Sequence, residues 1–238
     1  MPNPNGPYPG RQLFLGLTVE KKPCLVYLVT GRSPESRKRE AVHIENTVRI
    51  GPVEKGPYDP LRHYTAVKYD NSSGIAAVSN GIQTEAVYEI YRLLYNVDSA
   101  AGKEYVEDLL DGTNAEPDAI HTPRIAGVIV PTKGKPVAII GITTHDLRSV
   151  AYQFVPQPGK LAGISTYSGD LENPEPRDPH RPLSELEISA KTPAGLAQHL
   201  YEISAADYKG DDIRVCAVGA VYSGGEWEIA VLNKHNKS

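Results

Sequence analysis

Apolar residues along the chain fall in short runs separated by Pro, Gly, Asn and Asp, which is the pattern of β-strands joined by turns. These runs predict strands at residues 11–19, 24–30, 42–50, 63–69, 75–79, 124–130, 136–143, 147–155, 161–167, 213–222 and 226–232. Short polar turns such as residues 20–23, 70–74 and 131–135 join neighbouring runs, so we expect antiparallel hairpins.

In two stretches the apolar residues are spaced as on one face of a helix. Ala86, Val87, Ile90 and Leu94 form an apolar stripe, and a similar pattern predicts a second helix ending near Gly112. Thr192 and Pro193 are typical of an N-cap and a first helical residue, and they predict a third helix.

The order of strands, helices, strands, helix and strands predicts an α+β protein with mainly antiparallel sheets. With this many strands, we expect two stacked sheets with helices outside, a four-layer αββα sandwich. There is no internal repeat and no domain-scale change in composition. We therefore expect one domain over residues 1–238, with residues 1–7 as a flexible N-terminal extension.

Composition limits the classes of partner. The chain has 25 basic and 29 acidic residues and a net charge of −4, which gives no support for nucleic-acid binding. It has neither an apolar run long enough to span a membrane nor the pattern of a signal peptide, so we expect a cytoplasmic protein without a membrane partner. Cys24 and Cys216 lie in apolar runs and are expected to be buried free thiols rather than a disulfide.

A basic loop stands out against this acidic background. Residues 31–39 hold four cations and follow a predicted strand. Because the planar guanidinium suits phosphate, this cluster favours a small anionic ligand. The alternative is a solvated charge run, with Glu35 pairing with Arg39.

Two further segments contain candidate chemistry. Ser79–Asn80–Gly81 lies between a strand and a helix, where backbone amides can face an anion. Residues 116–124 include Glu116, Asp118 and Arg124, which offer a general base and a cation. A helix-entry turn and a charged surface loop are the structural alternatives. The seven histidines and two cysteines show no metal-binding spacing, so no metal is expected.

Together these segments resemble the archaeal type of IMP cyclohydrolase, from Tyr8 to about Leu232. The motifs that carry the resemblance are Tyr8-Pro9-Gly10-Arg11, Gly31-Arg32-Ser33 with Arg37, Tyr64, Val78-Ser79-Asn80-Gly81 with Thr84, Thr122-Pro123-Arg124-Ile125-Ala126, Ile140-Gly141-Ile142 and Ile164-Ser165-Thr166-Tyr167. Extra residues around 51–60, 100–112 and 173–183 depart from the family pattern.

The resemblance implies the αββα fold of N-terminal-nucleophile hydrolases. It also implies the last step of purine synthesis, ring closure of 5-formamidoimidazole-4-carboxamide ribonucleotide to IMP with loss of water. It implies no metal or organic cofactor, a purine ribonucleotide ligand, and a homo-oligomer, either a dimer or a tetramer.

On this basis we expect Arg32 and Arg37 to bind the 5′-phosphate, with Lys38 and Arg39 as solvated neighbours. Arg11 or Arg124 would reach the phosphate or the carboxamide. The proton-transfer group is expected to be Glu116, with Asp118 as the alternative. The remaining expected site residues are a hydroxyl donor to the oxyanion, Tyr64, and three groups that orient the heterocycle, Asn80, the Gly81 amide and Thr122.

Two other functions compete with this interpretation. A non-catalytic purine nucleotide-binding protein would need the arginines but not Glu116 or Tyr64. An amidohydrolase of the N-terminal-nucleophile type needs a terminal Ser, Thr or Cys, whereas this sequence starts Met1-Pro2 and would need internal self-cleavage.

Overall fold

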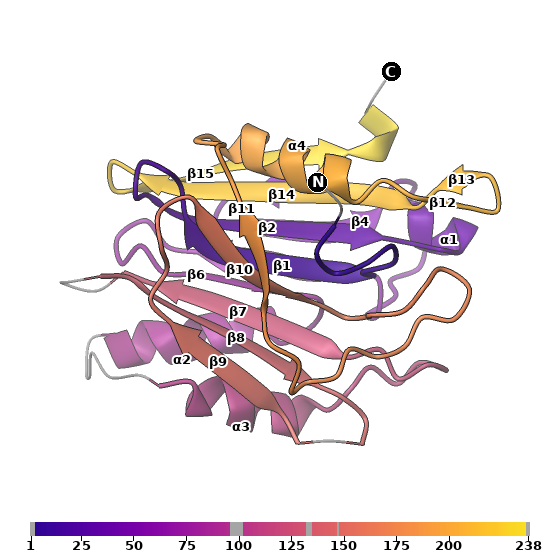
Figure 1. Cartoon of the computed structure of the whole chain (residues 1–238), viewed down its shortest axis with the longest axis horizontal. Coiled ribbons are helices and arrows are strands. Elements are labelled where there is room, and N and C mark those ends of the chain that lie inside the picture. The colour runs from indigo at the N-terminus through magenta and orange to yellow at the C-terminus, as the bar shows by residue number, and fades with distance from the viewer. Residues whose placement is uncertain (1–2, 96–101, 132–134, 147, 237–238) are drawn as a thin grey trace.

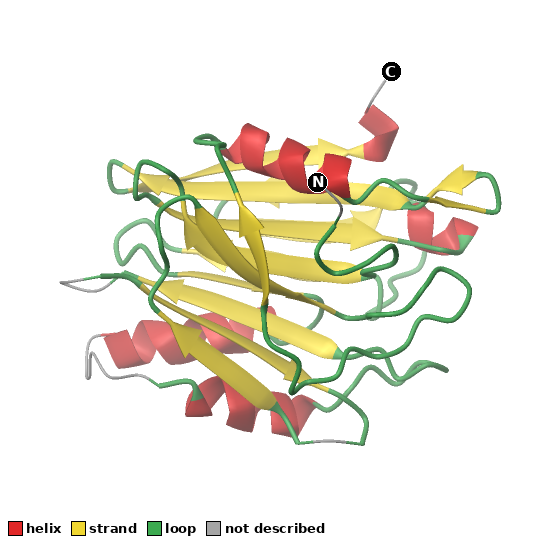
Figure 2. Ribbon diagram, in the orientation of Figure 1, coloured by secondary structure: helices red, strands yellow, loops and turns green. Residues whose placement is uncertain are grey.

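The protein is an α+β structure with two large antiparallel sheets, as the computed structural model shows for residues 3–95, 102–131, 135–146 and 148–236 (Figures 1 and 2). The first sheet has six strands in the order β11 (Ser184–Glu187), β10 (Lys160–Ser165), β1 (Arg11–Leu17), β2 (Pro23–Thr30), β14 (Arg214–Ser223) and β15 (Glu226–Asn233).

The second sheet has seven strands that follow one another in chain order. They are β3 (Arg39–Ile44), β4 (Thr47–Pro52), β5 (Tyr64–Tyr69), β6 (Ala76–Ser79), β7 (Arg124–Val130), β8 (Val137–Thr143) and β9 (Val150–Phe154). A small separate hairpin is formed by β12 (Asp207–Tyr208) and β13 (Asp211–Asp212).

Helices cover the outer faces of the two sheets. Helices α2 (Thr84–Tyr95) and α3 (Glu104–Thr113) lie along the seven-stranded sheet, and α4 (Pro193–Ile203) lies along the six-stranded sheet (Figure 1). Two short helical turns, α1 (Pro34–Arg37) and η1 (Lys234–Asn236), complete the helical elements of the described residues.

Strand alternation explains how the core is divided. In β1, Leu13 and Leu15 pack in the apolar cluster between the sheets, whereas Phe14 packs in the cluster beneath α4. Successive side chains of a strand point to opposite faces, so one strand contributes to both layers.

The antiparallel pairings bring the segments that contain the candidate site residues to one end of the sheets. Arg11 opens β1 beside the end of β2, and Arg124 opens β7 beside Ser79 at the end of β6. The candidate active site lies at this end.

The sequence-based strands are mostly confirmed, with some corrections. Residues 42–50, expected as one strand, belong to two strands, β3 and β4, which turn at Glu45 with a positive φ of 52°. The strand expected at 147–155 spans 150–154, and Leu147 lies outside the described residues, as does most of the turn at 131–135.

Buried side chains anchor two segments, the N-terminal extension expected to be flexible and the extra residues at 173–183. Asn5, in the N-terminal extension, is only 4% exposed and donates to Gln12 Oε1 at 2.9 Å. Arg177, among the extra residues at 173–183, is 1% exposed and donates to the Pro182 carbonyl. Both cysteines are buried free thiols, as expected. Among the described helices, none has the length and apolar character to cross a membrane.

Candidate active site

A pocket of about 490 Å³ opens where the basic loop meets the end of the six-stranded sheet. Its lining residues are Tyr8, Arg11, Thr30, Arg32, Ser33, Pro34, Ser36, Arg39, Asp118, Ile120, Thr122, Tyr167, Tyr208 and Lys209. The lining includes four cationic side chains and one carboxylate, Asp118. In a protein with a net charge of −4, this local excess of positive charge favours an anionic ligand.

Glu116 forms a buried ion pair with Arg11 beside this pocket. Arg11 Nη2 lies 2.5 Å from Glu116 Oε1, and the two side chains are 11% and 2% exposed. Burial raises the pKa of Glu116 above its usual value, although Arg11 and Arg124 oppose this shift. Burial alone would lower the pKa of Arg11, but Glu116 and nearby tyrosines raise it overall, so the guanidinium stays charged.

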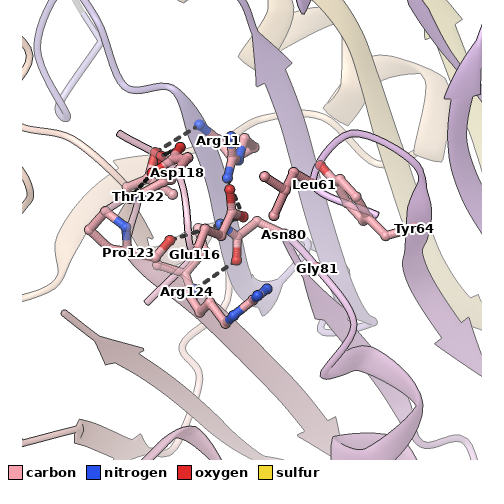
Figure 3. A network of polar contacts seen from close by, with 12 residues as sticks. Arg11, Leu61, Tyr64, Asn80, Gly81, Glu116, Asp118, Thr122, Pro123 and Arg124 are labelled. Atoms are coloured by element: carbon pink, nitrogen blue, oxygen red, sulfur yellow. Dashed lines mark hydrogen bonds and ion pairs between the residues drawn. The ribbon is translucent and has the colours of Figure 1, made fainter. Parts of the chain in front are cut away.

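Asn80 positions Glu116 and the start of β7. Its Nδ2 donates to the Pro123 carbonyl at 2.9 Å and approaches Glu116 Oε1 at 3.4 Å, while its Oδ1 accepts from the Ile125 amide at 2.8 Å (Figure 3). Gln83 Nε2 also donates to this oxygen, at 3.1 Å. Both contacts to Glu116 therefore involve Oε1, and within the described part of the chain Oε2 has no hydrogen-bond partner.

Arg124 places a second guanidinium in the same cluster. It is 5% exposed, its Nε lacks a partner in the described structure, and its Nη1 reaches Gln83 Oε1 only at 3.5 Å. The guanidinium lies beside Gly81 (Figure 3), where a Cβ would collide with Nη1. Glycine at position 81 thus makes room for the cation.

Tyr64 approaches the cluster from the side opposite Thr122 (Figure 3). Its hydroxyl lies 2.7 Å from the Tyr27 hydroxyl, and both side chains are buried. Burial raises the pKa of Tyr64, so the phenol is neutral at physiological pH and can donate a hydrogen bond.

Thr122 links Asp118 to Tyr167. Its Oγ1 lies 2.5 Å from both Asp118 Oδ2 and the Tyr167 hydroxyl, and its amide donates to Asp118 Oδ1 at 2.8 Å. Burial raises the pKa of Tyr167 to about 12. Asp118, the alternative proton-transfer group, lines the pocket directly, whereas Glu116 lies behind Arg11.

The cations of the basic loop occupy three kinds of position: in the pocket lining, in an ion pair outside the lining, and exposed to solvent. Arg32 lines the pocket, and its guanidinium carbon lies 5.4 Å and 5.9 Å from the ring centroids of Tyr8 and Tyr208. Arg37 turns away from the pocket lining, donating to Asp211 Oδ2 at 2.6 Å and to the Arg32 carbonyl at 2.5 Å. Lys38 is exposed, as expected.

Arg39 corrects the expectation of a solvated neighbour. It is 2% exposed, lines the pocket, and its Nε donates to the Ser36 carbonyl at 2.7 Å. It begins β3, and this strand turns its side chain inward. The loop is therefore not a solvated run, and Arg39 occupies the place in the pocket expected for Arg37.

The sequence interpretation also missed several residues of the site. Gln83 supports both Asn80 and Arg124 from the turn before α2, and Tyr27 partners Tyr64 from β2. Tyr208 and Lys209 come from a hairpin far along the chain. The high tyrosine content is a weak signal for a polar pocket but does not identify individual tyrosines.

The described residues contain no group of three or more His, Cys, Asp and Glu side chains that could hold a metal ion. The polar side chains of the cluster and the pocket lining include carboxylates, guanidinium groups and hydroxyls. Such a set can bind an anion, move a proton and stabilise a developing oxyanion.

Comparison with known proteins identifies the family. Residues 8–226 match the family described as IMP cyclohydrolase-like protein. A protein of Haloarcula marismortui named IMP cyclohydrolase is 26% identical over 231 residues, covering 93% of this chain and 99% of the relative. The family match spans the whole site, from Tyr8 and Arg11 to Lys209, and the chain belongs to the IMP cyclohydrolase-like protein family.

Proposed function

We propose that this protein is an IMP cyclohydrolase, which closes the ring of 5-formamidoimidazole-4-carboxamide ribonucleotide to give IMP and water. The observation that carries the proposal is the buried Glu116–Arg11 pair beside a cationic pocket in a chain of this family. The ligand is a purine ribonucleotide, and the reaction needs no metal or organic cofactor.

The reaction forms one carbon–nitrogen bond and releases one water. The carboxamide nitrogen attacks the formyl carbon, and one amide proton is transferred to the formyl oxygen to give a carbinolamine. Loss of that hydroxyl, with the proton of the formamido nitrogen, then forms the ring double bond. An amide is a poor nucleophile, so holding it against the formyl group contributes much of the rate.

Glu116 is the group that handles the amide proton. Arg11 and Asn80 fix Oε1, so Oε2 is the oxygen that accepts the proton. The raised pKa of Glu116 brings its basicity closer to that needed at neutral pH. Asn80 has its amide engaged within the protein, so it acts on the substrate by holding Glu116.

The oxyanion forms next to an excess of positive charge. Arg11 and Arg124 surround the single carboxylate of Glu116, which leaves one net positive charge in a buried site. Tyr64 supplies a neutral hydroxyl donor. Fixed cations and donors of this kind stabilise negative charge that develops in the transition state.

The rest of the pocket binds the nucleotide. Arg32 and Arg39 face the 5′-phosphate, and Thr122 orients the heterocycle. The Gly81 amide, expected to share that task, donates to Ser79 Oγ at 3.3 Å and is not part of the pocket lining. Arg37, expected as a direct phosphate ligand, instead pairs with Asp211.

Family membership also supports proposals for the fold family and the assembly. Helices outside two stacked sheets fit the αββα sandwich of N-terminal-nucleophile hydrolases, which we propose as the fold family. We also propose that the protein is cytoplasmic and forms a homo-oligomer, either a dimer or a tetramer.

The test is an assay for IMP formation with purified protein and the formylated ribonucleotide, followed by absorbance and by chromatography of the product. We expect enzyme-dependent, multiple-turnover formation of IMP. Tight binding of IMP without turnover would instead support a nucleotide-binding protein. Cleavage of the chain seen by intact-mass measurement, with amide hydrolysis, would support an amidohydrolase.

A further inference from the structure

The hairpin of β12 and β13 reaches the cationic end of the pocket from far along the chain. Asp207 pairs with Asp212 and Tyr208 pairs with Asp211, so Lys209 and Gly210 form the two-residue turn. Both turn residues have positive φ, 54° and 84°, as a tight hairpin turn of the I′ type requires. Figure 1 shows the hairpin beside α1.

The two sides of this hairpin contact two arginines of the basic loop. The Tyr208 ring lies 5.9 Å from the Arg32 guanidinium carbon, and Asp211 Oδ2 accepts from Arg37 Nη2 at 2.6 Å. Arg37 also donates to the carbonyl of Arg32. The hairpin, Arg32 and Arg37 are therefore connected through direct contacts.

Lys209 adds a cation to the pocket at this end. Its Nζ lies 5.1 Å from the Tyr208 ring centroid, and its side chain lines the pocket with Arg32 and Arg39. Asp118 is the pocket's carboxylate, and Thr122 occupies both of its oxygens. A dianionic group would thus meet Arg32, Arg39 and Lys209 together.

We propose that Lys209 binds the anionic end of the ligand and determines specificity for a phosphorylated one, and that the Arg37–Asp211 ion pair is a positioning contact that holds this hairpin in place. The inference rests on the proposed function, because the anionic group is the 5′-phosphate of the ribonucleotide. Arg37 then acts through Asp211 and does not touch the phosphate.

The first experiment compares Lys209→Met with the matched variant Lys191→Met, whose lysine pairs with Glu20 away from the pocket lining. We expect Lys209→Met to raise KM for the ribonucleotide by about tenfold or more with little change in kcat, as for loss of one charge-assisted hydrogen bond. Calorimetry should show weaker binding of IMP but unchanged binding of inosine. Lys191→Met should behave as wild type.

The second experiment separates a positioning role of Arg37 from direct phosphate binding. Asp211→Ala should raise KM in the same direction as Lys209→Met, and Asp211→Glu should restore it. If Arg37 bound phosphate directly, removing its competing carboxylate would leave KM unchanged or lower it. Glu89→Ala, which removes ion pairs with Lys68 and Arg92 outside the pocket lining, is the control and should have no effect.

The outcomes distinguish this inference from the proposed function. Absence of IMP formation by the wild-type protein would overturn the proposed function. The wild type could turn over normally while Lys209→Met keeps the wild-type preference for IMP over inosine. That result would overturn only the proposed role of Lys209 and leave the proposed function standing. An unchanged KM in Asp211→Ala would overturn the positioning role.

Discussion

Gly81 has no side chain, and the guanidinium of Arg124 occupies the space that a side chain would need. A Cβ at this position would collide with Arg124 Nη1 and lie 2.8 Å from Gln83 Oε1. Both groups belong to the network that holds Glu116 and Asn80. The backbone at position 81 therefore sets where the second cation of the site lies.

We predict that Gly81→Ala displaces Arg124 and lowers kcat/KM by about tenfold or more, since misplacing a group at a reacting centre is costly. The matched control is Gly112→Ala, where a Cβ would meet nothing within 4 Å at the end of α3. The control should retain full activity and gain up to about 1 kcal/mol in free energy of unfolding. Equal activity of the two variants in a steady-state assay would contradict this role of Gly81.

Two neighbouring tyrosines, Tyr64 and Tyr27, are expected to contribute differently to kcat. Tyr64→Phe removes the proposed donor to the oxyanion, whereas Tyr27→Phe removes only its partner 2.7 Å away. We predict that Tyr64→Phe lowers kcat by about 10²-fold, the size seen for loss of one oxyanion donor. Tyr27→Phe should have a clearly smaller effect on kcat. The reverse order of the two kcat values would remove Tyr64 from the mechanism.

The sequence places some site residues better than others. Asn80, Glu116, Thr122 and Arg124 lie in short segments beside predicted strand ends, and the structure brings them together. The choice between Arg37 and Arg39 could not be made from the loop. It depends on Asp211, which lies 174 residues from Arg37 along the chain.

The sequence predicts best the helices and strands whose apolar residues follow a clear run or helical spacing. The spans of β7 and α2 follow from a continuous apolar run and a helical stripe. The hairpin of β12 and β13 was missed, because its strands are two residues long and carry polar side chains. The division of residues 42–50 into two strands was also missed, since Glu45 and Asn46 interrupt the alternation only briefly.

Helix α4 begins at a predicted cap that the structure confirms. Thr192 Oγ1 accepts from the Gly195 amide at 3.2 Å, and Pro193 occupies the first turn. We predict that Thr192→Ala lowers the free energy of unfolding by about 1 kcal/mol, while Thr192→Ser retains most of the cap. Chemical denaturation measures both. A loss of equal size in both variants would show that the cap hydrogen bond is not responsible.

The whole molecule assembles one site from distant parts of the chain. Antiparallel pairing brings the start of β1 and the end of β2 together, and likewise the end of β6 and the start of β7. Loops from residues 31–39 and 114–123 and the late hairpin then complete the pocket. Fold class was predictable because strand and helix periods are local, whereas the pocket depends on contacts between segments far apart in sequence.

Charge is distributed differently in the pocket and in the rest of the protein. The chain is acidic overall, yet cations exceed carboxylates in the pocket lining. Behind this lining, Glu116 lies between two guanidinium groups. We propose that this carboxylate, and not the more accessible Asp118, transfers the proton in ring closure.

Single-turnover formation of IMP by folded Glu116→Gln, compared with Asp118→Asn and wild type, is the direct test of this role of Glu116. Excess enzyme and saturating conditions isolate the chemical step from ligand binding. We predict that Glu116→Gln is slower by about 10²–10⁴-fold, the usual contribution of a positioned proton-transfer group. Asp118→Asn should stay within about tenfold of wild type, because Asp118 only orients Thr122. A near-normal rate for Glu116→Gln, with the large loss in Asp118→Asn, would instead assign the proton transfer to Asp118.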